Sequence, residues 1–595
     1  MTHAELFHLG SAAGAPTEDL VPATFVAVIA LAALALFGVA HRTGRTRLLT
    51  RLATFSERGS GLPGWAALPA AITGGALLVA VFGFYWDVAT HIDSGRDPGP
   101  FANPSHFLII GGLAGIALAG VVAVLLGRDE HPSAWEIRDG WFVPIGGLLL
   151  LLCGGVAVLG FPLDDVWHRL FGQDVTLWSP THIQMVGGAS LSTLALWVLI
   201  VEGRRAAPRT TRRVPRFLEI QAAGAFLIGL SALHAEFDYS VPQFRLLFHP
   251  VVLMGSAGIA LVAARARLGR GGALAAVAFF LAVRGILSAV IGPLMDHTLL
   301  HFPLYLVEAL VVEAIALRVD TKDAVRFALI AGAGIGTFGL AAEWAWSHAW
   351  MVMSWPASLG IEAVVLGLVA ALVGSCAGAF IARALNGDAR ERPPFPKPVA
   401  IATLLGLVAV LAYPFPTTGA SDARATVTAT PVEREGWARI EVALDPASTA
   451  TDAEWFKVSA WQGGGSVVTP LEPRGDGRYV AQQAVPVDGE WKTLVRLHDD
   501  RALLAIPIYL PADPVIPAEG VPAPDPEVTR DVVSDKELLL REAQDVSTAL
   551  TVGASSVLAV LIALWIAAII WGLRRIDGHT PGPRGRSTRS AAVPA

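Results

Sequence analysis

Repeated apolar stretches constrain the fold of this chain more than any other feature. A helix needs roughly 20 mostly apolar residues to cross the hydrocarbon core of a bilayer. Stretches of that kind recur along most of the 595 residues, so we predict an all-α polytopic membrane bundle of about 13 transmembrane helices. The predicted spans are residues 21–40, 65–86, 105–126, 141–161, 181–201, 217–235, 248–264, 272–293, 300–317, 325–342, 357–383, 398–414 and 551–573.

The composition agrees with a membrane protein. Hydrophobic residues make up 53% of the chain and charged residues 16%, against about 25% charged residues in ordinary soluble domains. This excludes a soluble enzyme and a disordered chain. The net charge of -6 also offers no basic excess for nucleic acid, so we expect no nucleic-acid partner.

Arginine and lysine residues gather in every second connecting segment. Positive residues in short loops mark the cytoplasmic side of a membrane protein. We therefore expect residues 1–20 to lie outside, the twelve-helix domain to span residues 21–415, and the basic tail of residues 574–595 to be cytoplasmic. The Ala- and Arg-rich composition is typical of a GC-rich bacterium, which predicts the plasma membrane as the location.

Residues 420–550 have a different pattern from the rest of the chain. Short alternating runs between turn residues predict a small β-sandwich over residues 420–512. A Pro-rich linker and a short helix occupy residues 513–550, ahead of the last span. The topology places this domain outside the membrane. It contains His498 and no cysteine, so a cupredoxin-type centre, which needs both residue types, is not expected.

Nine of the fifteen histidines fall at the predicted outer ends of spans, and they follow an internal repeat. Two complete copies have Asp-x-x-x-His at the end of one span, then Pro-Ser/Thr-His and a Gly-Gly pair at the start of the next. The copies lie in hairpins 65–126 and 141–201, and weaker copies lie in 217–264, 272–317 and 325–383. The residues of the complete copies are Asp87, His91 and His106, and Asp164, His168 and His182.

The spacing in each complete copy predicts a metal site. An Asp and a His four residues apart share one face of a helix, and the short loop returns the second His to the same depth. Two imidazoles and a carboxylate suit a transition metal with open coordination positions, such as copper or iron. Alternatively, the Asp orients an imidazole through its ring N–H. Structural roles at the membrane interface are the competing interpretation for these residues.

The weaker copies supply further candidates. Additional metal ligands could come from His234, His249, Glu236, Asp238, His297, His301 and His348. Arg284 lies inside a predicted span, where a charge is costly and usually functional. Its predicted partners, in a structural ion pair or along a proton path, are Glu308, Glu313 and Glu343.

The segment DDVWHRLFGQDVTLWSPTHI resembles the metal-binding helix–loop–helix in the C subunit of copper membrane monooxygenases, the particulate methane and ammonia monooxygenases. The resemblance covers only 20 to 30 residues of each complete copy. It implies that Asp164, His168 and His182 bind copper, and that Asp87, His91 and His106 repeat the pattern. The segment GEWKTLVRLHDD is loosely similar to β-sandwich domains of membrane copper-handling proteins.

Several functions remain open from the sequence. The first is a copper-dependent, monooxygenase-like oxidoreductase that acts on a small apolar substrate arriving from the lipid bilayer. The second is a non-enzymatic protein for copper transport, delivery or sensing, which would meet a copper chaperone. The third is a haem protein that uses facing histidines such as His91 and His234, and the fourth is a transporter or scaffold. The β domain could contact a redox donor or an oligomer partner.

Overall fold

The computed structural model describes most of the chain. Parts of the predicted segments 1–20, 513–550 and 574–595 lie outside the described residues. The described ranges are 15–96, 101–128, 131, 133–172, 177–207, 213–387, 396–416, 422–513, 518–541 and 546–578.

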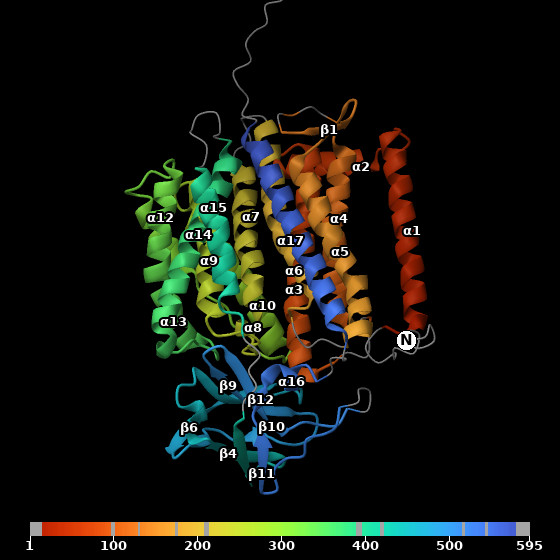
Figure 1. The fold of residues 1–595 in the computed structure, drawn as a ribbon. Helices are drawn as coiled ribbons and strands as arrows, with labels where there is room; N and C mark the ends of the chain where they lie inside the picture. Colours follow the sequence, from red (N-terminus) through yellow and green to blue (C-terminus); the bar gives the residue numbers. More distant parts are fainter. Residues whose placement is uncertain are drawn as a thin grey trace, which may run out of the picture.

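The protein is a polytopic helical bundle with a β domain at one end (Figure 1), as predicted. Eleven helices of the described ranges are long and apolar enough to cross a membrane. The start of α1 and the β domain lie at the same end of the bundle (Figure 1). The helices of the bundle are α1 (Thr17–Arg42), α2 (Leu48–Ser60), α3 (Gly64–Ser94), α4 (Pro104–Leu126), α5 (Ile145–Phe171), α6 (Pro180–Ala206), α7 (Arg213–Ser231), α8 (Ala235–Asp238), α9 (Phe248–Leu268), α10 (Gly272–Ala289), α11 (Leu306–Ile315), α12 (Ala324–Gly334), α13 (Leu340–Trp350), α14 (Gly360–Asn386), α15 (Lys397–Ala412) and α17 (Thr548–Asp577).

Two predicted spans correspond to shorter helices, so the count of thirteen stays a prediction. The segment 300–317 is helical only over the ten residues of α11, and the segment 398–414 forms the 16-residue helix α15. Pro303 disfavours helix in the residue before it. Glu343 of α13 accepts hydrogen bonds from the backbone N–H groups of Leu304 and Tyr305. These bonds stabilise the start of α11 at Leu306.

Small residues bring the hairpin helices together. A Cβ atom on Gly112 of α4 would lie 2.5 Å from the Cβ of Ala80 on α3, and one on Gly188 of α6 would lie 2.7 Å from the carbonyl oxygen of Cys153 on α5. Only Gly allows such close approach between membrane helices. In the first Gly-Gly pair the other residue, Gly111, meets nothing within 4 Å. One residue of that pair therefore sets the helix contact.

The β domain is a ten-stranded sheet in which every paired strand is antiparallel. Alternate residues of β3 and β4 are buried, which matches the alternating sequence pattern. The arrangement as a sandwich stays a prediction. The strand order is β11-β3-β4-β7-β6-β5-β9-β10-β12, with β8 paired to β4. The strands are β3 (Arg424–Pro431), β4 (Trp437–Asp445), β5 (Trp455–Trp461), β6 (Ser466–Gly475), β7 (Arg478–Ala481), β8 (Val485–Pro486), β9 (Lys492–Asp499), β10 (Ala502–Tyr509), β11 (Glu527–Asp531) and β12 (Val533–Ser534).

The turn between β5 and β6 binds directly to the end of α3. The backbone N–H of Gln462 donates to the carbonyl oxygen of Ile92 at 2.9 Å, and that of Gly464 donates to the carbonyl oxygen of Asp93 at 2.9 Å. Arg96 adds an ion pair with Asp513 at 2.9 Å. The sheet is thus fixed to the helix end that carries His91.

We expect Gly120→Ala to destabilise the bundle. A Cβ at this position of α4 would lie 2.4 Å from the backbone nitrogen of Leu151 on α5, so the helices would have to separate. Overpacking of this kind costs about 1–3 kcal/mol. Thermal unfolding in detergent, followed by tryptophan fluorescence, would detect the lower Tm. The matched control, Gly111→Ala on the same helix, should leave the Tm unchanged, and equal effects would contradict the packing argument.

We also expect the stability to depend on pH through Glu454. Burial raises the pKa of Glu454 to about 7 from its ordinary 4.5, although the nearby Arg245 opposes the shift. A carboxyl whose pKa is raised by folding stabilises the protein below its unfolded pKa, and this contribution disappears as the pH rises through about 7. Tm measured between pH 4.5 and 8 should therefore fall less in Glu454→Gln than in the wild type. The exposed Glu433→Gln variant should follow the wild-type curve.

Candidate metal centres

The first complete copy forms a compact cluster of one carboxylate and two imidazoles. Asp87 and His91 lie one turn apart near the end of α3, and His106 lies in the first turn of α4. The Oδ1 atom of Asp87 is 3.6 Å from Nε2 of His91 and 2.9 Å from Nε2 of His106. One ligand atom from each of the three residues lies within 4.8 Å of the others. The structure therefore brings these three predicted residues together.

Residues at the start of α4 orient the first cluster. Asn103 is the N-cap and accepts a hydrogen bond from the backbone N–H of Ser105, as expected for Asn at that position. The Asn103 amide and the Ser105 hydroxyl both donate to Oδ1 of Asp87, at 2.9 and 2.7 Å. The Nδ1 atom of His91 lies 2.9 Å from the carbonyl oxygen of Gly95. That bond points Nε2 of His91 toward the carboxylate, as in many metal sites.

The second complete copy forms the same cluster between α5 and α6. The Oδ2 atom of Asp164 is 3.6 Å from Nε2 of His168 and 3.4 Å from Nε2 of His182. One ligand atom from each of these three residues again lies within 4.8 Å of the others. Ser179 is the N-cap of α6, and the Thr181 hydroxyl donates to Oδ1 of Asp164. One carboxylate oxygen is thus held by the helix start while the other faces both imidazoles.

The shared design indicates what the clusters can bind. Each offers two imidazole nitrogens and a carboxylate oxygen on rigid helix ends, which suits copper or iron with open positions. In the second cluster, Nε2 of His168 is buried and has no hydrogen-bond partner among the described residues. A bound ion would satisfy that nitrogen. These are the two groups of three or more His, Cys, Asp or Glu residues in the described ranges that could hold a metal ion.

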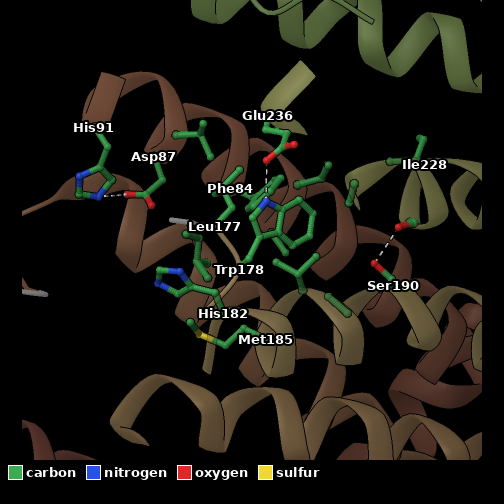
Figure 2. A pocket seen from close by; sticks show the side chains of 18 of the residues that line it. Phe84, Asp87, His91, Leu177, Trp178, His182, Met185, Ser190, Ile228 and Glu236 are labelled. Carbon is green, nitrogen blue, oxygen red and sulfur yellow. Dashed lines mark hydrogen bonds and ion pairs between the residues drawn. The ribbon is translucent and has the colours of Figure 1, made fainter. Parts of the chain in front are cut away.

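Both clusters open onto one cavity of about 380 Å³. Figure 2 shows Asp87, His91 and His182 grouped near Leu177 and Trp178. The cavity continues into the bundle between α3, α6 and α7, and at its other end it reaches the β domain. Most of its lining is apolar, including Leu77, Leu113, Met185, Leu196, Ile200 and Ala222.

Glu236 lies along the same cavity rather than in a metal cluster. Its Oε2 atom accepts a hydrogen bond from Nε1 of Trp178 at 2.8 Å (Figure 2). Its Oε1 atom is buried and has no hydrogen-bond partner among the described residues. The third copy of the repeat therefore contributes a carboxyl group to the cavity wall.

The other acid of the third copy forms an ion pair. Oδ1 of Asp238 lies 2.8 Å from Nδ1 of His234, and Oδ2 accepts from Arg284 at 2.5 Å. All three side chains are fully buried. The predicted pairing of Arg284 with a glutamate was wrong, because Asp238 comes closer from α8. His249 contacts His234, with ring centroids 4.4 Å apart.

The predicted glutamate partners of Arg284 have other surroundings. Glu313 pairs with Arg265 at 2.8 Å, and Glu343 accepts the backbone bonds at the start of α11. Glu308 is fully buried, and neither of its carboxyl oxygens has a hydrogen-bond partner among the described residues. The three glutamates are therefore not arranged around Arg284.

His297, His301 and His348 lie outside both clusters. Nδ1 of His297 is 2.8 Å from Oδ2 of Asp93, and its Nε2 accepts a hydrogen bond from Nε1 of Trp86 at 3.2 Å. Nδ1 of His301 is 3.3 Å from the carbonyl oxygen of Asp238. The exposed His348 bonds the carbonyl oxygen of its own helix, at Trp344. The structure therefore does not bring these three histidines into either cluster.

The orienting residues Asn103 and Ser179 were not singled out in the sequence. Ser105 and Thr181 were noted there as part of the Pro-Ser/Thr-His pattern, but without a role in the sites. The signal that could have found them is Asn/Ser at the N-cap, followed by Pro at the first helical position. Comparisons with protein families, with curated proteins and with solved structures found no match to this chain. The interpretation of the clusters therefore depends on their own geometry.

We expect His297→Ala to lower stability and His348→Ala to leave it unchanged. Removing the His297 ring withdraws a partner from the buried carboxylate of Asp93, which costs about 1–3 kcal/mol. His348 is exposed, and among the described residues it bonds only along its own helix. Chemical unfolding in detergent micelles would measure both changes. A destabilised His348→Ala, or an unchanged His297→Ala, would contradict these assignments.

Proposed function

We propose that the protein binds one copper ion in each Asp/His/His cluster and acts as a copper-dependent oxidoreductase on a small apolar substrate. The observation that carries this proposal is that two equivalent clusters face the same, mostly apolar cavity. We further propose that the clusters and the β domain lie on the outer face of a plasma membrane. The resemblance to the C subunit of copper membrane monooxygenases supports the choice of copper.

The residues of the chain have separate parts in this proposal. His91 and His106 bind the ion together with Asp87, while Ser105 holds the carboxylate in place. Bound copper would supply the capacity to activate dioxygen. Apolar side chains such as Leu113 keep the adjacent space dry, and a substrate without charge would enter it at little desolvation cost.

The cavity also suggests where reducing equivalents would arrive. Residues of strands β5, β6 and β9 line its end at the sheet domain, and they include Trp461, Lys492 and Arg496. A redox donor that docks on the sheet would approach the clusters from this side. The same face would serve a copper chaperone if the protein delivers copper without turnover.

Haem is a weaker alternative on geometric grounds. Two histidines that ligate haem must face each other across the porphyrin ring. The two histidines suggested from the sequence belong to separate groups, since His91 lies with Asp87 and His106, and His234 lies against His249. The contact between the rings of His234 and His249 leaves no room for a porphyrin between them.

The test is copper(II) binding by the full-length protein in lipid nanodiscs. We expect two equivalents per chain by equilibrium dialysis, with nitrogen hyperfine structure in the electron paramagnetic resonance spectrum. His106→Ala should remove one equivalent, and His106→Ala/His182→Ala should remove both. His348→Ala is the matched control and should keep both. Copper content that is the same in all variants would overturn the ligand assignment.

Ser105→Ala provides a finer test of the first cluster. The variant keeps all three ligands but removes a hydroxyl that holds the carboxylate of Asp87. Loss of such an orienting bond typically weakens metal affinity about 10–100-fold. Competition with a chromophoric chelator would measure the change, and only one of the two equivalents should be affected. A uniform loss at both clusters would argue against this role.

Oxidoreductase activity requires a separate measurement. With a quinol as reductant and a short-chain alkene as substrate, the copper-loaded wild type should consume dioxygen and oxidise the alkene. His106→Ala/His182→Ala should do neither. Copper binding without any dioxygen consumption would instead favour the delivery or sensing function.

A further inference from the structure

The third copy of the repeat contains a pair of histidines that the two clusters do not use. His234 ends the short 3-10 helix at Ala232–His234, and His249 lies in the first turn of α9. They are 15 positions apart, as are His91 and His106 in the first copy. Both rings are fully buried, and their centroids are 4.4 Å apart.

Three of the four ring nitrogens in this pair have no hydrogen-bond partner among the described residues. They are Nε2 of His234 and both nitrogens of His249. A buried polar atom without a partner costs about 1–3 kcal/mol. The pair therefore gives up a considerable stabilisation unless something else binds these nitrogens.

The remaining nitrogen is held in a way that prepares His234 for a ligand. Its Nδ1 lies 2.8 Å from the carboxylate of Asp238, which is itself paired with the buried Arg284. The Nδ1–H group donates to this carboxylate, which leaves Nε2 as the ring nitrogen available to a ligand. Carboxylates hold metal-binding histidines in this manner in many proteins.

The surroundings of His249 are aromatic and dry. The Trp355 ring lies 4.7 Å from the His249 ring, and the Phe237 ring lies 4.9 Å from it, between centroids. The neighbouring carboxylate is already neutralised by its guanidinium partner. Such an environment disfavours a divalent ion, because two imidazoles would leave most of its charge uncompensated.

We propose that His234 and His249 form a third metal site, and that it takes copper(I). Copper(I) carries a single charge and accepts two neutral nitrogen ligands, whereas zinc sites in proteins almost always have four ligands. The site is separate from the two Asp/His/His clusters and goes beyond the proposed function. The two rings touch edge to face with centroids 4.4 Å apart, so binding an ion between their nitrogens would require the His249 side chain to rotate.

The first experiment separates this site from the two clusters. The full-length His106→Ala/His182→Ala protein in nanodiscs is dialysed without oxygen against copper(I) held by a competing chelator. We expect one tightly bound equivalent, and its loss in the triple variant that adds His249→Phe. Phe keeps the ring volume, and monodisperse elution with an unchanged Tm would show that the fold is intact.

His498 provides the matched control. It is also fully buried with both ring nitrogens unpartnered among the described residues, but it packs against Trp455 in the β domain. Adding His498→Phe in place of His249→Phe should leave the copper(I) equivalent bound. Loss of copper in both triple variants, or in neither, would overturn the proposal.

A second measurement does not depend on altering the pair. X-ray absorption of the copper(I)-loaded His106→Ala/His182→Ala protein should show two nitrogen neighbours with the outer-shell scattering of imidazole. Sulfur neighbours, or no bound copper(I), would overturn the site. Failure of the proposed function would appear differently, as the absence of copper(II) that depends on His106 and His182.

Discussion

The pairing of the two cluster carboxylates determines how this end of the bundle is built. An ionised carboxylate taken out of water costs several kcal/mol unless other groups replace its solvation. Asp87 receives a hydroxyl, an amide and an imidazole from the start of α4, and Asp164 receives a hydroxyl and two imidazole contacts. Each helix start therefore stabilises the acid that ends the preceding helix, and the hairpin and the cluster depend on the same contacts.

Close packing of the hairpins sets the position of the cavity. Glycines such as Gly112 and Gly188 bring the helices of each hairpin together, so the two clusters lie at similar points of two similar hairpins. The remaining space between the hairpins is lined by apolar side chains and has both clusters at its edge. A duplicated unit thus gives two sites with a common cavity, without any residue shared between the sites.

The sequence predicted the two clusters because their geometry is local. A spacing of four places Asp87 beside His91 on one helix face, and the hairpin loop returns His106 to the same level. Local spacing could not predict the partners of Arg284 and His297, because these partners are distant in the sequence. Arg284 pairs with Asp238, 46 residues away, and His297 pairs with Asp93, 204 residues away. The spans were predictable from apolar length, but the shortened α11 depends on Glu343 from another helix.

The docking of the β5–β6 turn has a mechanical consequence. This turn bonds the carbonyl oxygens of the last turn of α3, and the Gln462 side chain reaches the carbonyl oxygen of His91 itself at 3.3 Å. All of these bonds are made to α3, the first helix of the hairpin that carries the first cluster. A force that tilts the sheet would therefore act directly on the helix end that carries His91.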